Sequence, residues 1–302
     1  MDILLNARET AARLPWNRLV DEIAALLADP AVQVPQRLVQ PLPGGASLLL
    51  MPALDARLAI AKLITFTPAN AGTGRPTIQG DVVVFDVATG ARVLVLDGPT
   101  VTARRTAAVS LLAAQRLAPN PGGPLLIVGA GAQGLAHLEA FAHGLALREV
   151  RVASRSAASA QALADRARAL GLQASVVADA DAALADCALV VTCTPATAVV
   201  LSGPLRGDAF VAAVGSFTPT MVELGPESCR YCAEHGSVYL DTPDAAHEAG
   251  DLIQAGLDVS RFASLREVVL GTAPAARGPV LFKSCGWAGW DLAAARAATR
   301  SG

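Results

Sequence analysis

The sequence has little charge and few aromatic side chains. Of its 302 residues, 17% are charged and 4% are aromatic, and the formal net charge is only −2. A charge so near zero provides no basic surface for nucleic acid, and no run of Lys or Arg indicates an anionic membrane as partner. We therefore expect neither a nucleic acid nor a membrane partner.

Cysteine is also scarce, and its number is odd. Five cysteines in a chain of this length do not look like a disulfide framework, so a reducing compartment is expected. The N-terminus becomes charged within a few residues and lacks the basic start and long apolar core of a signal peptide. The uncharged stretch 187–205 contains prolines and glycine and fits a strand and loop better than a membrane span. These absences favour a cytoplasmic protein.

Hydrophobic residues, in contrast, make up 53% of the chain, enough for a large core. Length alone predicts about two domains. In the first part, apolar periodicity predicts helices over 15–28 and 102–117 and strands over 47–51, 57–66, 81–87 and 92–96. Proline, glycine and asparagine then dominate 119–124, which predicts a linker.

After this linker, strands and helices alternate. Strands are expected over 125–128, 150–153, 174–177, 188–192, 209–214, 237–241 and 279–282, and helices over 133–145, 157–170, 179–185 and 291–298. Such alternation is typical of a parallel, doubly wound sheet with right-handed crossovers. The predicted fold class is α/β: a Rossmann sheet, together with an α+β unit whose sheet is largely antiparallel.

The clearest chemical motif follows the first strand after the linker. The apolar run 125–128 leads directly into Gly129-Ala130-Gly131-Ala132-Gln133-Gly134, a G-x-G-x-x-G sequence. Gly129 permits the tight turn, Gly131 lets the backbone approach a pyrophosphate, and Gly134 lets helix and strand pack closely. The helix that begins here presents free N–H groups and a positive dipole end to the phosphates. The loop predicts a dinucleotide site, with a purely structural glycine turn as the alternative.

The end of the next strand indicates which dinucleotide is preferred. An NAD site usually carries Asp or Glu there to hold the ribose 2′-hydroxyl. This chain instead has Ser154 and Arg155, which suit a 2′-phosphate. We therefore expect NADPH to be preferred, with NADH possible; a merely solvated Arg155 is the alternative.

Lys62 lies in the middle of a strictly alternating apolar strand. Ile60, Lys62 and Ile64 share one face of that strand. If the face is buried, desolvation lowers the pKa of the ammonium, and Lys62 can donate a proton at neutral pH. A lysine on an edge strand whose head reaches solvent fits the pattern equally well.

Two adjacent arginines fall near the start of the helix expected from Thr102. With Thr102 as N-cap, Arg104 and Arg105 lie in the first turn, where cations oppose the helix dipole. An anionic ligand therefore explains them better than stability does. Neighbours in a helix point about 100° apart, so only one is expected to reach a given ligand. Arg37, alone in a turn-like stretch, is by itself typical of a surface residue.

Two other clusters are better explained by a structural role than by metal binding or catalysis. Cys229-x-x-Cys232 with His235 has metal-like spacing, but a structural zinc site needs a fourth ligand, and no second C-x-x-C or H-x-x-x-H follows. No metal is therefore expected. A helix start explains most of the acidic residues after 237–241, and no nucleophile turn accompanies them. This acidic cluster comprises Asp241, Asp244, His247, Glu248 and Asp251.

Taken together, several segments resemble the ornithine cyclodeaminase/μ-crystallin family. In chain order they are Arg37, Met51-Pro52-Ala53, Lys62, 80–90, Leu96-Asp97-Gly98, Thr102-Ala103-Arg104-Arg105-Thr106-Ala107-Ala108, 128–133, Glu223-Leu224 and Phe282-Lys283-Ser284-Cys285-Gly286. The T-A-x-R-T-A-A and G-A-G-A-Q segments are specific in this order, and the resemblance covers most of the chain.

The resemblance implies a homodimer of two-domain chains. Residues 1–118 and 283–302 would bind substrate and form the dimer, and 119–282 would bind the dinucleotide. Arg37 and Arg105 would grip a substrate carboxylate through charged hydrogen bonds, and Lys62 would contact the carboxylate or the reacting nitrogen. Lys62 and Arg105 are the expected catalytic residues. Beyond the glycine loop, Ser154 and Arg155, the expected dinucleotide contacts are Thr77, Arg105, Ala132, Gln133, Thr194, Val214 and Ser284.

One departure from the family concerns the reaction itself. Cyclodeaminases carry a catalytic Asp in a segment like G-x-D-x-P-G-K-x-E-L, and Phe217 stands at that Asp position here. Phe217 can neither accept a proton nor activate water, whereas hydride transfer to a preformed C=N bond needs no such base. An apolar Phe217 also suits the ring of a small cyclic imine. Phe217 is therefore expected to contact substrate, and the resemblance implies the same for Ser284.

The sequence thus predicts an enzyme that uses NAD(P)H to reduce a cyclic ketimine 2-carboxylate, foremost Δ1-pyrroline-2-carboxylate to L-proline. Three alternatives stay open: an ornithine cyclodeaminase that releases ammonia, an amino-acid dehydrogenase acting on an open-chain 2-oxo acid, and a non-enzymatic, μ-crystallin-like NADPH-binding protein. Phe217 and Arg155 argue against the first. The retained set of Arg37, Lys62 and Arg105 argues against the last.

Overall fold

The computed structural model describes residues 3–70 and 73–300, which divide into two compact units. Unit 1 comprises the chain up to Thr106 and again from Trp287, and unit 2 runs from Ala107 to Gly286. The sequence predicts the domain boundaries between residues 118 and 119 and between residues 282 and 283. The first division instead falls within helix α3 (Gly98–Leu117), since the second half of this helix bonds to helix α4 (Ala132–Gly144) of unit 2 through Ser110 and His137.

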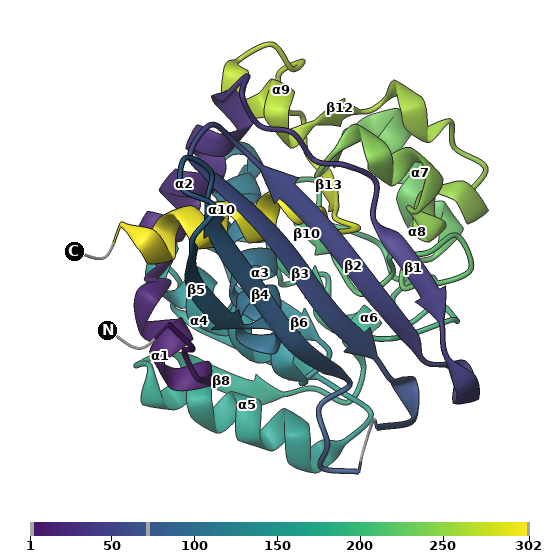
Figure 1. Ribbon diagram of the computed structural model, residues 1–302. Coiled ribbons are helices and arrows are strands. Elements are labelled where there is room, and N and C mark those ends of the chain that lie inside the picture. The colour runs from purple at the N-terminus through teal and green to yellow at the C-terminus, as the bar shows by residue number, and fades with distance from the viewer. Residues whose placement is uncertain (1–2, 71–72, 301–302) are drawn as a thin grey trace. The chain divides into compact units, whose positions relative to one another are not determined.

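Unit 1 contains a five-stranded antiparallel sheet in the order β1-β2-β3-β4-β5 (Figure 1). Its strands are β1 (Leu38–Pro41), β2 (Ser47–Leu54), β3 (Leu58–Phe66), β4 (Ile78–Asp86) and β5 (Arg92–Asp97). The sheet is antiparallel, as predicted. The sequence missed β1, whose residues are all exposed and give no period-two burial signal.

Helices cover one face of this sheet. Helix α10 (Ala288–Thr299) packs against β2 and β3 and against α2 (Trp16–Ala28), and α1 (Ala7–Arg13) lies against β5 and α10 (Figure 1). Nearly all of α10 is buried, because its many alanines let neighbouring backbones approach closely. The opposite face is more open: Leu38, Leu50 and Leu63 lie in register on adjacent strands and are exposed.

The helix start predicted at Thr102 is wrong. Helix α3 begins at Gly98, with Pro99 in the first turn, where proline is tolerated. The carboxylate of Asp97 acts as the cap, since Oδ1 accepts a hydrogen bond from the Thr100 N–H at 2.8 Å. Arg104 and Arg105 therefore lie beyond the first turn, and the argument from the helix dipole does not apply to them.

Unit 2 is a doubly wound α/β sheet of eight parallel strands in the order β12-β11-β13-β10-β9-β6-β7-β8. The fold class is as predicted. The chain order reverses between β6 and β9, which is where such sheets bind ligands, beyond the carboxyl ends of the strands. The strands are β6 (Leu125–Val128), β7 (Glu149–Ala153), β8 (Gln173–Val176), β9 (Leu189–Thr192), β10 (Phe210–Ala213), β11 (Ser237–Leu240), β12 (Ala263–Ser264) and β13 (Val280–Lys283).

Helices α5 (Ala157–Ala169), α6 (Ala180–Ala183), α7 (Pro226–His235), α8 (Gly250–Gln254) and α9 (Leu265–Leu270) complete unit 2. The sequence missed α7, α8 and α9, which are short and lack a long apolar period. Among the helices of residues 3–70 and 73–300, none is long and apolar enough to cross a bilayer.

Candidate active site

Lys62 lies on the covered face of unit 1. It stands on β3, the central strand, paired in register with Met51 and Val82, and its side chain is 1% exposed. The alternative of a lysine on a sheet edge is therefore wrong. Its ammonium lies 2.9 Å from Oδ2 of Asp291 and donates to Oδ1 at 3.1 Å.

The electrostatic surroundings of Lys62 make its proton easier to lose. Burial lowers the pKa of the ammonium from 10.5 to about 8, and the positive charges of Arg105 and Arg37 act in the same direction. The carboxylate of Asp291 opposes this shift. Lys62 therefore carries a proton at neutral pH and releases it more readily than an exposed lysine.

The two adjacent arginines of α3 point in different directions. The Nε atom of Arg105 donates to Oδ1 of Asp291 at 3.3 Å, and this side chain is buried. Arg104 instead donates to the carbonyl of Leu14 at 2.9 Å and places its guanidinium 3.9 Å from the ring centroid of Trp16. Arg105 thus joins Lys62, whereas Arg104 fastens α3 to the start of α2.

The buried cluster of unit 1 carries more positive than negative charge. Lys62 and Arg105 both contact the carboxylate of Asp291, and the half-buried Arg37 adds to the positive field on Lys62. One turn before Arg105, the Thr102 hydroxyl is buried without a hydrogen-bond partner in the described part of the chain. A small anion would balance the excess positive charge of Lys62 and Arg105.

Asp291 is the member of this cluster that sequence reasoning missed. It lies in the first turn of α10, where the helix dipole stabilises an acidic residue. A structural role therefore explains it without any function. The available signal was a lone carboxylate in a helix whose residues, apart from Arg296 and Thr299, are otherwise glycine, alanine and other apolar residues.

In unit 2 the glycine loop has the geometry that a pyrophosphate needs. Gly129 has φ +114°, and a Cβ there would lie 2.8 Å from the Cys193 carbonyl oxygen. A Cβ on Gly134 would lie 2.1 Å from the Gly129 carbonyl, so helix and strand approach as predicted. A Cβ on Gly131 would meet nothing within 4 Å, which leaves open space at the helix start. These residues therefore fit a dinucleotide.

The start of α4 supports this assignment. Gly131 is its N-cap and supplies no side-chain hydrogen bond, so the first N–H groups are free of a side-chain cap. The Oε1 atom of Gln133 is buried and lacks a partner among the described residues. At the end of β7, Ser154 is half-buried and Arg155 is exposed, ahead of α5.

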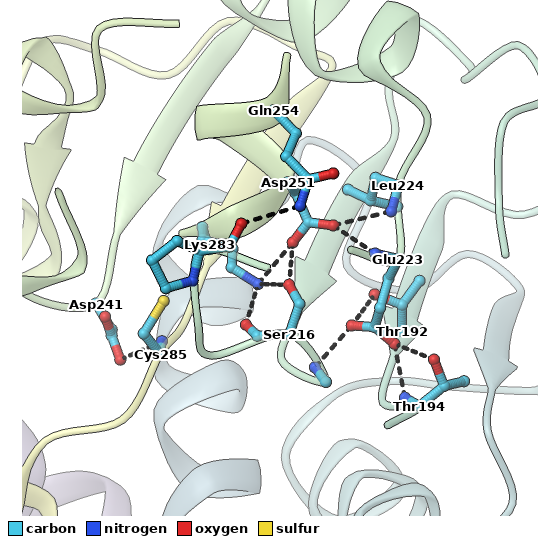
Figure 2. A network of polar contacts seen from close by, with 12 residues as sticks. Thr192, Thr194, Ser216, Glu223, Leu224, Asp241, Asp251, Gln254, Lys283 and Cys285 are labelled. Atoms are coloured by element: carbon cyan, nitrogen blue, oxygen red, sulfur yellow. Dashed lines mark hydrogen bonds and ion pairs between the residues drawn. The ribbon is translucent and has the colours of Figure 1, made fainter. Parts of the chain in front are cut away.

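Glu223 holds together the loops that follow β9 and β10 (Figure 2). Its Oε1 accepts from the backbone N–H and hydroxyl of Thr194 at 2.6 and 2.8 Å. Its Oε2 accepts from the Thr192 hydroxyl at 3.0 Å and the Gly215 N–H at 2.7 Å. Desolvation raises the pKa of this carboxyl. Thr194 and the residues around Val214 are therefore fixed by a fully buried acid.

A buried ion pair continues this network (Figure 2). The Lys283 ammonium, at the end of β13, lies 2.7 Å from Oδ2 of Asp251 and donates to the carbonyl and the hydroxyl of Ser216, both at 2.5 Å. The other Asp251 oxygen accepts the N–H groups of Glu223 and Leu224 at 2.6 and 2.9 Å. Burial lowers the pKa of Lys283, but the carboxylate of Asp251 outweighs it and raises the pKa.

Several predicted contact residues are already engaged within their own unit. The Ser284 hydroxyl donates to Oδ2 of Asp241 at 2.8 Å, and that oxygen also accepts the N–H groups of Cys285 and Gly286. Phe217 is half-buried and packs against the core of unit 2. Thr77, which lies in unit 1 just before β4, is also half-buried. Asp251 lies in the first turn of α8, as a helix start predicts, and also bonds to Glu223 and Leu224. Asp241 lies at the end of β11 and fixes residues 284–286 instead.

The cysteines with metal-like spacing belong to the core. Cys229 and Cys232 are buried on α7, and desolvation raises the pKa of Cys232 to about 12. His235 is exposed at the end of that helix, with its ring centroid 5.0 Å from that of Tyr231. Within residues 3–70 and 73–300, no group of three or more His, Cys, Asp or Glu is arranged to hold a metal ion.

Known proteins resemble the chain along almost its whole length. The Delta(1)-pyrroline-2-carboxylate reductase 1 of Burkholderia multivorans is 40% identical over 299 residues, covering 98% of this chain and 94% of that protein. The Delta(1)-pyrroline-2-carboxylate/Delta(1)-piperideine-2-carboxylate reductase of Azospirillum brasilense is 40% identical over 301 residues, with coverages of 98% and 94%.

A solved structure has the same fold. The Delta(1)-pyrroline-2-carboxylate reductase of Thermococcus litoralis, in complex with NADH and L-proline, superposes with a TM-score of 0.90 at 24% identity, covering 98% of this chain and 96% of that one. The model of the ornithine cyclodeaminase/mu-crystallin family matches residues 9–300. This chain belongs to the ornithine cyclodeaminase/mu-crystallin family.

Proposed function

We propose that the chain is an NAD(P)H-dependent reductase of cyclic ketimines that carry a 2-carboxylate, foremost Δ1-pyrroline-2-carboxylate. The observation that carries this proposal is the buried cluster of Lys62 and Arg105 around one carboxylate, with excess positive charge. Relatives at 40% identity that are named reductases of this substrate support it.

The residues of unit 1 suit a small carboxylate substrate. Arg105 and Arg37 bind the carboxylate, because guanidinium groups form strong charged hydrogen bonds with it. The free hydroxyl of Thr102 supplies a further hydrogen bond. Lys62 then donates its proton to the ring nitrogen. The imine carbon gains a hydride and the nitrogen gains a proton, so the C=N double bond becomes a CH–NH single bond.

The residues of unit 2 suit a dinucleotide. A reduced nicotinamide dinucleotide, when bound, supplies the hydride. The N–H groups at the start of α4 bind its pyrophosphate, and Gly131 leaves the room for it. Ser154 and Arg155 at the end of β7 favour a 2′-phosphate over a free ribose hydroxyl. We therefore propose NADPH as the preferred cofactor, with NADH as a poorer one.

The open face of the five-stranded sheet suits a second copy of the chain. Leu38, Leu50 and Leu63 lie side by side on β1, β2 and β3 and are 59%, 38% and 47% exposed. A contiguous apolar row on a sheet face marks an interaction site. We propose that this face forms a homodimer.

The test is oxidation of NADPH with three substrates side by side: pyrroline-2-carboxylate, piperideine-2-carboxylate, and pyruvate with methylamine. We expect turnover with the cyclic imines and far less with the open-chain mixture. Arg105→Ala should lower kcat/KM about 10- to 100-fold through loss of charged hydrogen bonds. Arg104→Ala is the matched control: Arg104 is the neighbour of Arg105 but contacts Trp16 instead, so this variant should retain turnover.

Three other results would contradict the proposed reductase function. Tight NADPH binding without oxidation of any imine would identify a binding protein. Preference for pyruvate with methylamine would identify a dehydrogenase of open-chain substrates. Equal loss in Arg104→Ala and Arg105→Ala would remove the assigned substrate site.

A further inference from the structure

We propose that Asp291 is the positioning residue of the site: its carboxylate fixes the Lys62 ammonium and the Arg105 guanidinium in place and keeps Lys62 charged for proton donation. The proton-donating part of this inference rests on the proposed reductase function. Asp291 acts through Lys62 and Arg105 and makes no contact with substrate itself.

The geometry places Asp291 between the two cations. Oδ2 lies 2.9 Å from the Lys62 ammonium, and Oδ1 accepts from Lys62 at 3.1 Å and from Arg105 Nε at 3.3 Å. Asp291 is fully buried, and the two cations are nearly so. Three secondary-structure elements, β3, α3 and α10, thus meet at one carboxylate. An ammonium held by two contacts has little freedom to turn away from a substrate nitrogen.

The charges around Lys62 show why this carboxylate is needed. From α3 comes Arg105, and from the segment before β1 comes Arg37; both are positive. The neighbouring strands supply Met51 and Val82, which are apolar. Burial and both arginines favour the neutral amine, and Asp291 on α10 opposes them. Without this carboxylate, the amine would lose its proton at a lower pH and could no longer donate one.

The amino-acid composition permits a direct test. The chain has two lysines, Lys62 and Lys283. Isotopic labelling of lysine in the full-length protein therefore gives NMR signals from two side chains, one from each unit, and Lys62→Met assigns them. In the wild type we expect the Lys62 signal to titrate near pH 8, whereas Lys283, bonded to Asp251, stays charged through that range.

Asp291→Asn should lower the titration midpoint of Lys62 by about one to three pH units, the range for loss of a close opposite charge. The basic limb of the kcat–pH profile with pyrroline-2-carboxylate should move down by the same amount. Asp291→Glu retains the negative charge and should restore most of the midpoint. A purely structural role would lower the kcat plateau and leave both midpoints where they are.

Asp55→Asn is the matched control. Asp55 is also a buried carboxylate of unit 1 that bonds to α10, through Arg296 Nε at 2.6 Å. This variant should destabilise unit 1 comparably and leave the Lys62 titration unchanged.

The two hypotheses fail in distinguishable ways. An unchanged Lys62 midpoint in Asp291→Asn, or an equal shift in Asp55→Asn, would overturn the role of Asp291. A shifted midpoint in a protein that reduces no cyclic imine would leave the charge coupling intact and reject the reductase function and the proton donation that depends on it.

Discussion

The ammonium of Lys283 lies 2.7 Å from Oδ2 of Asp251, and neither side chain is exposed. Lys283→Met would leave the Asp251 carboxylate buried without its cation, which costs about 3–5 kcal/mol when one partner of a buried pair is removed. Because Asp251 also accepts the N–H groups of Glu223 and Leu224, the loops after β9 and β10 should loosen. We expect lower stability in urea and weaker NADPH binding.

Arg206→Met is the control for Lys283→Met. It removes an ion pair of similar length in unit 2, between Arg206 Nε and Asp208 at 2.7 Å, but both side chains are more than one-third exposed. Such a pair contributes no more than about 1 kcal/mol. Equal loss of unfolding free energy in the two variants would contradict a special contribution of the buried Lys283–Asp251 pair to stability.

The lowered pKa of Lys62 predicts a pH dependence of catalysis. The ammonium is the proton donor, so the active form exists below the pKa of about 8 and is lost as the pH rises through it. We expect kcat for imine reduction to fall above about pH 8, far below the ordinary range of lysine. Steady-state kcat measured across this range checks the position of the limb.

Substitutions of Lys62 separate charge from proton transfer. Lys62→Arg keeps a positive charge but cannot release a proton in this range, so we expect a low kcat without the limb near pH 8. Lys62→Met should lower kcat about 100- to 10,000-fold, the usual contribution of a general acid. A limb that persists in Lys62→Arg would assign the titration to another group.

Much of unit 2 could be predicted from sequence because its signals are local. The run 125–134 specifies strand, turn and helix start within ten positions, and the glycines at 129 and 134 meet the close contacts expected of them. The alternating pattern of β3 likewise put Lys62 on one face with Ile60 and Ile64, and that face is buried, although the pattern fitted an edge strand equally well. In these cases the burial pattern and the backbone requirement lie within a single element.

The contacts that complete the candidate site are not local. Lys62 and Asp291 are 229 positions apart, and only the packing of α10 against β3 brings them together. The start of α3 was misplaced since Asp97, which ends β5, also caps the next helix, whereas Thr102 only resembles a cap. Helix propensity cannot choose between two residues of cap-forming type that lie five positions apart.

Arg155 predicts the preference between dinucleotides. Arg155→Asp replaces a cation at the end of β7 with the acidic residue typical of NAD sites. We expect KM for NADPH to rise at least about tenfold, through a lost charged hydrogen bond and a new repulsion, while KM for NADH changes little or falls.

Arg148→Asp controls for the change in net charge. Arg148 is exposed just before β7, at the opposite end of the strand from Arg155. It should leave both KM values unchanged. A similar rise in KM for NADPH in both variants would reduce the effect of Arg155 to a general electrostatic one.

The apolar side chain at position 217 predicts that the chain does not deaminate ornithine. Without an acid at this position, the protein should release no ammonia from ornithine. If the proposed contact of Phe217 with substrate holds, Phe217→Asp should weaken binding of the cyclic imine by about tenfold or more, through loss of apolar contact and repulsion by a second carboxylate. Phe217→Leu keeps the apolar surface and should have a KM near that of the wild type. Ammonia release by the unaltered protein would instead support a cyclodeaminase.

The exposed leucines of the five-stranded sheet predict the oligomeric state. Leu63→Asp places a charge in the middle of the apolar row formed with Leu38 and Leu50. A charge buried in an apolar interface without a partner is costly, so sedimentation should detect monomers where the wild type gives dimers. Leu270→Asp on α9 is the matched control, because Leu270 is 46% exposed against 47% for Leu63 but lies in unit 2. If both variants sediment like the wild type, the dimer uses another surface; if only Leu63→Asp dissociates, the sheet face is the interface.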